Sequence, residues 1–191
     1  MRSVETALLY LGADFVVSSD PGELNGAERL IFPGVGEARA TMDVLESTGL
    51  GEALVSFYRT GQPMLGICIG CQIILDGSEE RDTTCLGLVR GRALRFPENP
   101  ELKVPHMGWN QVRIKKKHHV FDGVPEASSF YFVHSYYPEP EDKSVELAQT
   151  DYGLTFASVI GQENLVAVQF HPEKSGRVGL KFLSNFLNWK R

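Results

Sequence analysis

Hydrophobic positions in the first part of the chain predict alternating helices and strands. Apolar residues within 4–11 recur at helical spacing, and Gly12 stands where a C-cap would end that helix. The amphipathic stretch 37–58 predicts a helix interrupted near 49–51, and helical character resumes from Gln72. Short apolar runs predict strands at 15–19, 29–36 and 63–68. This order predicts an α/β fold with a mainly parallel central sheet and helices on both faces.

From Gly87 the pattern changes to short β-rich segments separated by Gly, Pro and Asp. Such spacing favours antiparallel hairpins, so we expect a β-rich C-terminal half. An amphipathic helix is predicted at 178–189, and the absence of repeats and linkers predicts a single domain over 1–191. The β-rich segments are 87–96, 110–114, 128–137, 145–150, 154–160 and 165–170.

Composition narrows the possible functions without selecting one. The 191 residues are 42% hydrophobic and 23% charged, which is typical of a globular protein with a substantial core. A net charge of −5 and the lack of a basic stripe argue against a nucleic-acid partner. No apolar run reaches the roughly 18–20 residues of a membrane span. Three cysteines, an odd number, favour a reducing cytoplasm over a secreted disulfide framework.

The stretch LGICIGCQ, residues 65–72, places Cys68 between an apolar strand and a following helix. Gly66 and Gly70 flank it, as small residues flank a nucleophile held at a tight strand-to-helix turn. The helix N-terminus would favour the thiolate and offer N–H groups to an oxyanion. One alternative is a small buried core cysteine. Another is a redox or metal motif, because Cys71 completes a C-x-x-C.

A thiol nucleophile needs a base, and QFHPEKSG, residues 169–176, offers one. His171 ends an apolar strand, and Glu173 follows two residues later. Residues i and i+2 of an extended segment project to the same side, so the carboxylate could orient the imidazole and stabilise its charged form. The alternative is a histidine that merely ends a strand.

The sequence FPGVG, residues 32–36, ends another strand that we expect at the same edge of the sheet. Glycines on both sides of Val35 would let its N–H point at an oxyanion, with the N–H of Ile69 as the second donor. Taken alone, P-G-x-G is merely a turn.

Together, G-x-C-x-G-x-Q, the later H-P-E and the upstream P-G-x-G resemble the class I (triad) glutamine amidotransferases. Within that class, the chain is similar to the family of glutaminase subunits of imidazole glycerol phosphate synthase, from histidine biosynthesis. The resemblance covers nearly the whole chain. It is carried by PGVG, PHMGWN (105–110), FVHSYY (132–137), QFHPEKSG and GLKFLSNF (179–186).

The resemblance implies a catalytic triad that hydrolyses L-glutamine without a cofactor or a metal. Cys68 would attack the side-chain amide and form a glutamyl thioester. His171 would protonate the departing ammonia and then activate water, while Glu173 orients His171. The family class further implies a three-layer fold.

The resemblance also implies substrate and partner contacts. The oxyanion would be held by Val35 and Ile69. The amino-acid end of glutamine would be held by Gly34, Gly36, Gln72, Ser135 and Tyr136. Trp109, Asn110 and Lys174 would face the partner, a (β/α)₈ barrel cyclase subunit that uses the channelled ammonia in a heterodimer.

Two departures from the family pattern stand out. The family begins with a strand and a D-Y-G-x-G-N-type loop before the R-S-V helix, whereas this chain starts at Met1. We expect pairing edges and core surface to be exposed as a result, and a misassigned start site or a truncated chain as the cause. Cys71 also stands where the family more often has a bulky apolar residue.

Three other functions stay open on the sequence. The chain could be a related amidotransferase that feeds ammonia to another synthase, a redox or metal protein built on C-x-x-C, or a catalytically inactive interaction subunit. The rest of the sequence offers no second pair at metal-ligand spacing, which disfavours the metal alternative.

Overall fold

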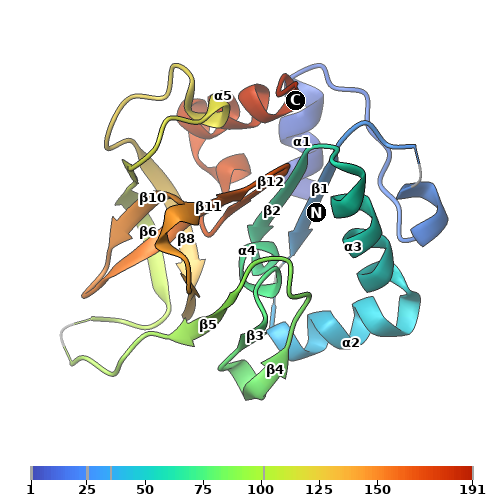
Figure 1. Cartoon of the computed structure of the whole chain (residues 1–191). Coiled ribbons are helices and arrows are strands. Elements are labelled where there is room, and N and C mark those ends of the chain that lie inside the picture. Colours follow the sequence, from blue (N-terminus) through green and yellow to red (C-terminus); the bar gives the residue numbers. More distant parts are fainter. Residues whose placement is uncertain (1, 25, 35, 101, 191) are drawn as a thin grey trace.

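The structure is a computed structural model that describes residues 2–24, 26–34, 36–100 and 102–190 (Figure 1). Within these ranges the central sheet has six strands. The first three are parallel to one another, and each later strand is antiparallel to its neighbour. The expected α/β architecture is confirmed, but the central sheet is mixed and not mainly parallel, because only its first three strands run parallel to one another. In spatial order the strands are β1 (Leu30–Gly34), β2 (Met64–Cys68), β12 (Leu165–Val168), β11 (Thr155–Gln162), β10 (Glu146–Asp151) and β7 (Arg113–Ile114).

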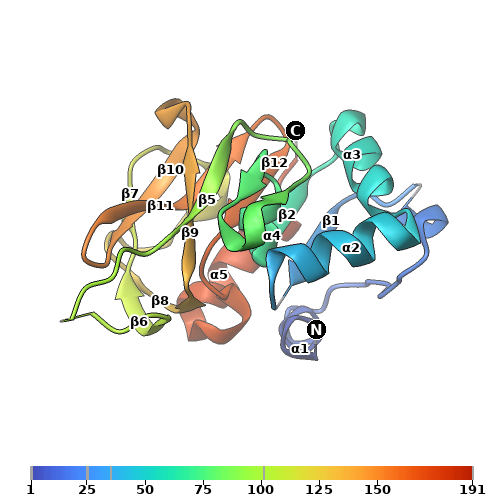
Figure 2. The ribbon, with the colours of Figure 1, turned by 90° about the horizontal axis from the view of Figure 1, so that it is seen from below.

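Helices cover both faces of this sheet (Figure 2). Strand β12 shows why, because its side chains alternate between two apolar cores. Val166 and Val168 pack in the core with α1 (Arg2–Tyr10) and α5 (Gly176–Leu187). Leu165 and Ala167 point the other way, into a core that includes residues of α3 (Leu50–Thr60). A strand buried on both faces needs an apolar residue at every position, as LVAV provides.

The helix expected over 37–58 is two helices that meet at Gly49. Helix α2 (Ala38–Thr48) ends there, and α3 begins at the next residue. Gly49 has a φ of 74°, a left-handed conformation that glycine adopts without steric cost. The interruption expected near 49–51 is therefore confirmed.

Among the described residues, two smaller sheets and several short turns accompany the central sheet. In one sheet β3 (Gly77–Ser78), β4 (Thr83–Thr84), β5 (Gly91–Arg95) and β9 (Tyr136–Pro140) are hydrogen-bonded. In the other, β6 (His106–Gln111) pairs with β8 (Ser129–His134). The 3₁₀ turns are η1 (Pro21–Leu24), η2 (Glu80–Asp82), η3 (His119–Phe121), η4 (Lys143–Val145) and η5 (Pro172–Lys174).

Two expected elements were wrong. Residues 15–19 do not form a strand, because no described strand lies beside them to pair with. Phe15 packs against the core, while Val16 is 81% exposed. Helix α4 (Ile69–Ile73) is a single short turn and does not continue from Gln72. The chain turns at Asp76, whose carboxylate accepts the N–H of Gly91 at 2.9 Å. None of the helices in the described ranges combines the length and apolarity that crossing a bilayer requires.

Candidate active site

Cys68 lies at the corner between β2 and α4, in a backbone conformation that costs energy. Its φ is 57° and its ψ is −106°, unusual for a residue with a side chain. The surrounding glycines make this corner possible. A Cβ at Gly70 would lie 2.6 Å from the carbonyl oxygen of Phe32, and one at Gly66 would lie 2.9 Å from the carbonyl oxygen of Gly70. The G-x-C-x-G pattern therefore reflects backbone packed against backbone around the thiol.

His171 and Glu173 form a buried pair beside this corner. Nδ1 of His171 lies 2.9 Å from Oε1 of Glu173, and the two side chains are 2% and 3% exposed. The expected extended geometry was wrong, because Glu173 lies in the 3₁₀ turn η5 that begins at Pro172. The turn nevertheless brings the two side chains together, and Ser3 of α1 donates a hydrogen bond to Glu173 Oε1 at 3.5 Å.

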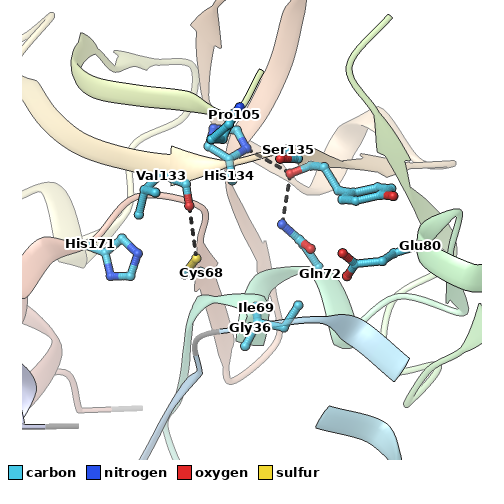
Figure 3. Close-up of a pocket in the computed structure, with 11 residues that line it drawn as sticks. Gly36, Cys68, Ile69, Gln72, Glu80, Pro105, Val133, His134, Ser135 and His171 are labelled. Atoms are coloured by element: carbon cyan, nitrogen blue, oxygen red, sulfur yellow. Dashed lines mark hydrogen bonds between the residues drawn. The ribbon is translucent and has the colours of Figure 1, made fainter. Parts of the chain in front are cut away.

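The surroundings of His171 favour its charged form. Burial alone would lower the pKa of His171, but the side chains of Cys68 and Glu173 outweigh this effect and raise its pKa to about 9. In Figure 3 the imidazole ring lies beside Cys68. A protonated imidazole next to the sulfur stabilises a thiolate and can give its proton to a leaving group.

A pocket of about 280 Å³ opens at this corner, a volume suited to an amino acid. It brings together residues that are distant in sequence, from Gly36 to His171 (Figure 3). Most of the expected site residues line it, namely Gly36, Cys68, Ile69, Gln72, Ser135, Tyr136 and His171. Val133 and His134 also contribute to the wall, and the Cys68 sulfur lies 3.9 Å from the carbonyl oxygen of Val133.

Gly34 lies behind the pocket wall. A Cβ on Gly34 would collide with the side chain of Ile69, so this glycine allows β1 to approach α4 closely. Gly36 lines the pocket and has a φ of 115°, in the region that favours glycine. Val35, expected as an oxyanion donor, lies outside the described residues. Ile69, the other expected donor, opens α4 at the pocket wall.

Gln72 is oriented by two acceptors. Its Nε2 donates to the carbonyl oxygen of Tyr136 at 2.9 Å and to Oε1 of Gln169 at 3.0 Å. An amide nitrogen has two hydrogens, so both are used within the protein. The amide oxygen of Gln72 is then the atom that can accept a donor from a ligand in the pocket.

Glu80 lines the same pocket with its carboxylate, and the sequence did not point to it. Its Oε2 accepts the backbone N–H of Ala38, at the start of α2, at 2.6 Å. The neighbouring Glu37 forms an ion pair with Arg81 at 3.0 Å, so two contacts tie residues 37–38 to η2. No local motif marks Glu80, because the adjacent Glu79 looks identical in sequence and instead accepts the N–H of Arg95.

The comparisons with known proteins agree on one family. The sequence profile of the family described as "Glutamine amidotransferase class-I" matches residues 2–189. The chain belongs to this family. A curated relative from Maridesulfovibrio salexigens, "Imidazole glycerol phosphate synthase subunit HisH", is 48% identical, with 98% of this chain and 91% of that protein covered. A protein of the same name from Dehalococcoides mccartyi strain CBDB1 is 44% identical, with 97% of this chain and 90% of that protein covered.

Solved structures share the amidotransferase fold at low sequence identity. A putative GMP synthase protein from Thermoplasma acidophilum superposes with a TM-score of 0.71 at 21% identity, covering 97% of this chain and 85% of that one. The structure of PurLQS from Thermotoga maritima gives a TM-score of 0.71 at 18% identity, covering 98% and 91%. At these identities the likeness shows the fold alone.

In this amidotransferase, the residues expected at a partner interface lie on a surface beside the site. Trp109 on β6 is 59% exposed, and its ring lies 6.1 Å from that of Tyr131. The ammonium group of Lys174 lies 5.9 Å from the same Tyr131 ring. Asn110 is half-buried, and its Nδ2 lies 2.9 Å from the carbonyl oxygen of Asp151 and 3.2 Å from Nε2 of His106. Met107 is exposed on the same strand.

The C-x-x-C alternatives find no support in the placement of Cys71. Its side chain is fully buried in the apolar core that includes Leu54 and Ile74. Burial, with a smaller contribution from the charge of Cys68, raises the pKa of the Cys71 thiol well above its ordinary value. Such a thiol is a poor nucleophile and a poor metal ligand, so the geometry assigns Cys71 to packing.

Proposed function

We propose that this chain is the glutaminase subunit of an imidazole glycerol phosphate synthase. It hydrolyses L-glutamine to glutamate and ammonia and passes the ammonia to a cyclase subunit, which makes imidazole glycerol phosphate and AICAR in histidine biosynthesis. The observation that carries this proposal is the identity of 44–48% to curated subunits of that synthase over nearly the full chain. The buried His171–Glu173 pair beside a strained Cys68 supplies the chemistry.

The first half of the reaction uses Cys68 as the nucleophile. Its thiolate adds to the side-chain amide carbon of glutamine, forming a C–S bond and an oxyanion. The N–H of Ile69 receives the oxyanion, with the N–H of Val35 as the second expected donor. Protonated His171 then gives its proton to the amide nitrogen, the C–N bond breaks, and ammonia leaves a glutamyl thioester behind.

The second half releases glutamate. His171, now neutral, takes a proton from a water molecule, and the oxygen adds to the thioester carbon. The C–S bond breaks and returns the electron pair to sulfur, which restores the thiolate beside the imidazolium. Glu173 holds the imidazole through Nδ1 at 2.9 Å, so Nε2 is the atom that transfers protons in both halves.

The amino-acid end of glutamine fits the far end of the pocket. In Figure 3 the side chains of Gln72 and Glu80 lie at the opposite end from His171. The Glu80 carboxylate and the amide oxygen of Gln72 suit an α-ammonium group. The backbone at Ser135 and Tyr136, with Gly36, forms the remaining wall for the α-carboxylate.

The partner interface belongs to the same proposal. Trp109, Asn110 and Lys174 would face the (β/α)₈ barrel of the cyclase subunit in a heterodimer, in the cytoplasm. Ammonia released to water at neutral pH becomes ammonium, which is not a nucleophile, so direct transfer between subunits has a chemical reason.

The test is to mix the purified chain with the cyclase subunit from the same source and measure glutamate release, with and without the nucleotide substrate of the cyclase. We expect release that depends on the partner and on that nucleotide. Cys68→Ala should abolish it, while Cys71→Ala should retain it. Undiminished release by Cys68→Ala would refute the mechanism. Strong release by the isolated chain, unaffected by the cyclase, would refute the assignment to this synthase.

A further inference from the structure

Two buried histidines beside the pocket have no part in the proposed reaction. His106 on β6 and His134 on β8 are 3% and 5% exposed, and Nδ1 of His106 lies 2.9 Å from Nε2 of His134. The His106 ring stacks on the rings of Phe132 and Tyr152, at centroid distances of 4.9 and 3.9 Å. Buried polar groups are nearly always hydrogen-bonded, so the partner of each ring nitrogen shows whether that nitrogen carries a proton.

The proton positions in this pair follow from the groups at its two ends. Nδ2 of Asn110 lies 2.9 Å from the carbonyl oxygen of Asp151, which can only accept, so this atom is the amide nitrogen. Its second hydrogen points to Nε2 of His106, 3.2 Å away. His106 must therefore carry its proton on Nδ1 and donate to Nε2 of His134.

The same reasoning continues on the pocket side. His134 accepts at Nε2, so its proton is on Nδ1, which lies 2.8 Å from the carbonyl oxygen of Tyr136. That oxygen can only accept. The Asn110 end and the Tyr136 end of this series of hydrogen bonds therefore both require the Nδ1–H tautomer of the histidines. Burial is the main reason that the pKa of His106 falls to about 4 and that of His134 to about 3. For His134, the charges of His106 and His171 add to this effect. Both rings are thus neutral at neutral pH.

The carbonyl of Tyr136 also links the histidines to the nucleophile. It accepts Nε2 of Gln72, whose other hydrogen goes to Oε1 of Gln169. The amide of Gln169 is therefore oriented with its NH₂ group toward Cys68, and Nε2 lies 3.8 Å from the sulfur. Gln169 is fully buried. A flipped amide would place its oxygen against the thiolate and its NH₂ group against that of Gln72.

We propose that Gln169 is a further catalytic residue, an N–H donor to the Cys68 sulfur. Its orientation is set by Gln72 and the Tyr136 carbonyl, and a hydrogen-bond relay holds this carbonyl in place. The relay runs from Asn110 through His106 and His134 to the Tyr136 carbonyl. Gln169 stabilises the thiolate that attacks glutamine and that leaves the thioester. His106 and His134 are positioning residues that connect this donor to the surface of β6. This inference deepens the proposed function and rests on it for its role in turnover.

The thiolate itself is tested by alkylation, which needs no glutamine. The rate of Cys68 alkylation by iodoacetamide is measured against pH in the complex with the cyclase subunit. Gln169→Leu should move the midpoint to higher pH and lower kcat/KM for glutamine by roughly 10- to 100-fold, the range for a hydrogen bond to a charged group. The matched control is Gln62→Leu, the same change at an exposed glutamine, which should leave both unchanged. An unchanged midpoint in folded Gln169→Leu would overturn the proposal.

The relay is tested by two substitutions at His106. His106→Phe keeps a ring to stack on Tyr152 and loses both hydrogen bonds, whereas His106→Asn keeps a donor at the Nδ1 position and loses the ring. A relay predicts that the Asn variant stays closer to the wild-type alkylation profile than the Phe variant. A purely structural role predicts the reverse order, and that result would refute the relay.

Nitrogen NMR reads the tautomers directly. ¹⁵N shifts should show Nδ1–H and an unprotonated Nε2 on both His106 and His134, unchanged between pH 6 and 8. An Nε2–H tautomer or a charged ring in this interval would contradict the inference. These readouts stand apart from the proposed function. A wild-type complex that released no glutamate would overturn that function. The alkylation and NMR measurements would still test the relay, because neither depends on turnover of glutamine.

Discussion

The corner between β2 and α4 is more deeply buried and more extensively paired than the N-terminal segment. Strand β2 lies between β1 and β12 in the described sheet, and each of its residues is buried. By contrast, β1 is an edge strand of that sheet with only half-buried residues, and 15–19 runs beside the core without strand pairing in the described part. The site thus stands on the best-packed part of the sheet, where a strained Cys68 can be held.

The N-terminal segment still touches the site at one point. Ser3 of α1 donates to Glu173, and Val4 and Leu8 of the same helix pack in the core that α5 shares. The segment beyond the helix carries exposed apolar side chains, including Val16 and Val17. We therefore expect substitutions at the corner to lower the free energy of unfolding strongly, and substitutions in 15–19 to lower it little.

The largest stability effect is expected from Gly70→Ala. The new Cβ would lie 2.6 Å from the Phe32 carbonyl oxygen, which is backbone and cannot rotate away. We expect a loss of roughly 3–4 kcal/mol in the free energy of unfolding, measured by urea denaturation, together with loss of glutaminase activity. Gly12→Ala is the control for the substitution itself, because no atom lies within 4 Å of the added Cβ, although its φ of 70° leaves some strain. Equal losses in the two variants would show that the corner is not specially packed.

The next effect is a pH dependence of stability from His171. Its pKa of about 9 in the folded protein exceeds the ordinary value of about 6.5. The folded state therefore binds the proton more tightly than the unfolded state. The resulting stabilisation is complete below about pH 6.5 and is lost as the pH rises through 9. We expect a loss on the order of 2–3 kcal/mol between these limits, from urea denaturation at each pH.

Glu173→Gln should reduce this pH dependence, because the amide no longer stabilises the imidazolium and only the contribution of Cys68 to the raised pKa of His171 is left. His119→Gln, at an exposed histidine paired with Asp122, is the matched control and should keep the wild-type slope. Stability that rises from pH 6.5 to 9 in the wild type would contradict the buried charged pair.

A smaller effect is expected at the far end of the pocket. Glu80→Gln removes the negative charge that we assign to the α-ammonium of glutamine, so KM should rise by roughly tenfold with a lesser change in kcat. The control is Glu79→Gln, because Glu79 contacts the backbone of Arg95 outside the pocket. An unchanged KM for the Glu80 variant would place the ammonium elsewhere.

The smallest effect should come from the N-terminal segment. Val16→Ser replaces a side chain that is 81% exposed, so the free energy of unfolding should change by no more than about 0.5 kcal/mol. Val168→Ser, the same change in the buried centre of the sheet, should cost several-fold more. Comparable losses at the two positions would show that 15–19 is packed more firmly than its exposure indicates.

This contrast also explains how much the sequence could reveal. Strand β2 was predictable because burial on both faces requires a continuous apolar run, and the Gly49 break was predictable because a left-handed residue favours glycine. Residues 15–19 have the composition of a strand, but pairing depends on a neighbour that local sequence does not reveal. The short length of α4 was not predictable, because the carbonyls of Ile73 and Ile74 accept N–H groups from the later segment that contains Leu86, Leu88 and Val89.

The site divides in a similar way. Cys68 and His171 were accessible because each carries a reactive group within a recognisable motif, although the i, i+2 argument for Glu173 assumed an extended segment where a 3₁₀ turn occurs. Glu80 and Gln169 were missed. Their roles come from three-dimensional contacts, with the Ala38 N–H and with the Cys68 sulfur, that no local spacing indicates.

The central claim is that Cys68 forms a covalent intermediate with glutamine. Mass spectrometry of the complex with the cyclase subunit, quenched with acid during turnover and digested, tests it most directly. We expect a glutamyl thioester on the peptide containing Cys68, sensitive to hydroxylamine and assigned by fragmentation to Cys68 and not Cys71. Glutamate release that proceeds with no adduct on Cys68, or with the adduct on Cys71 or Cys85, would contradict it.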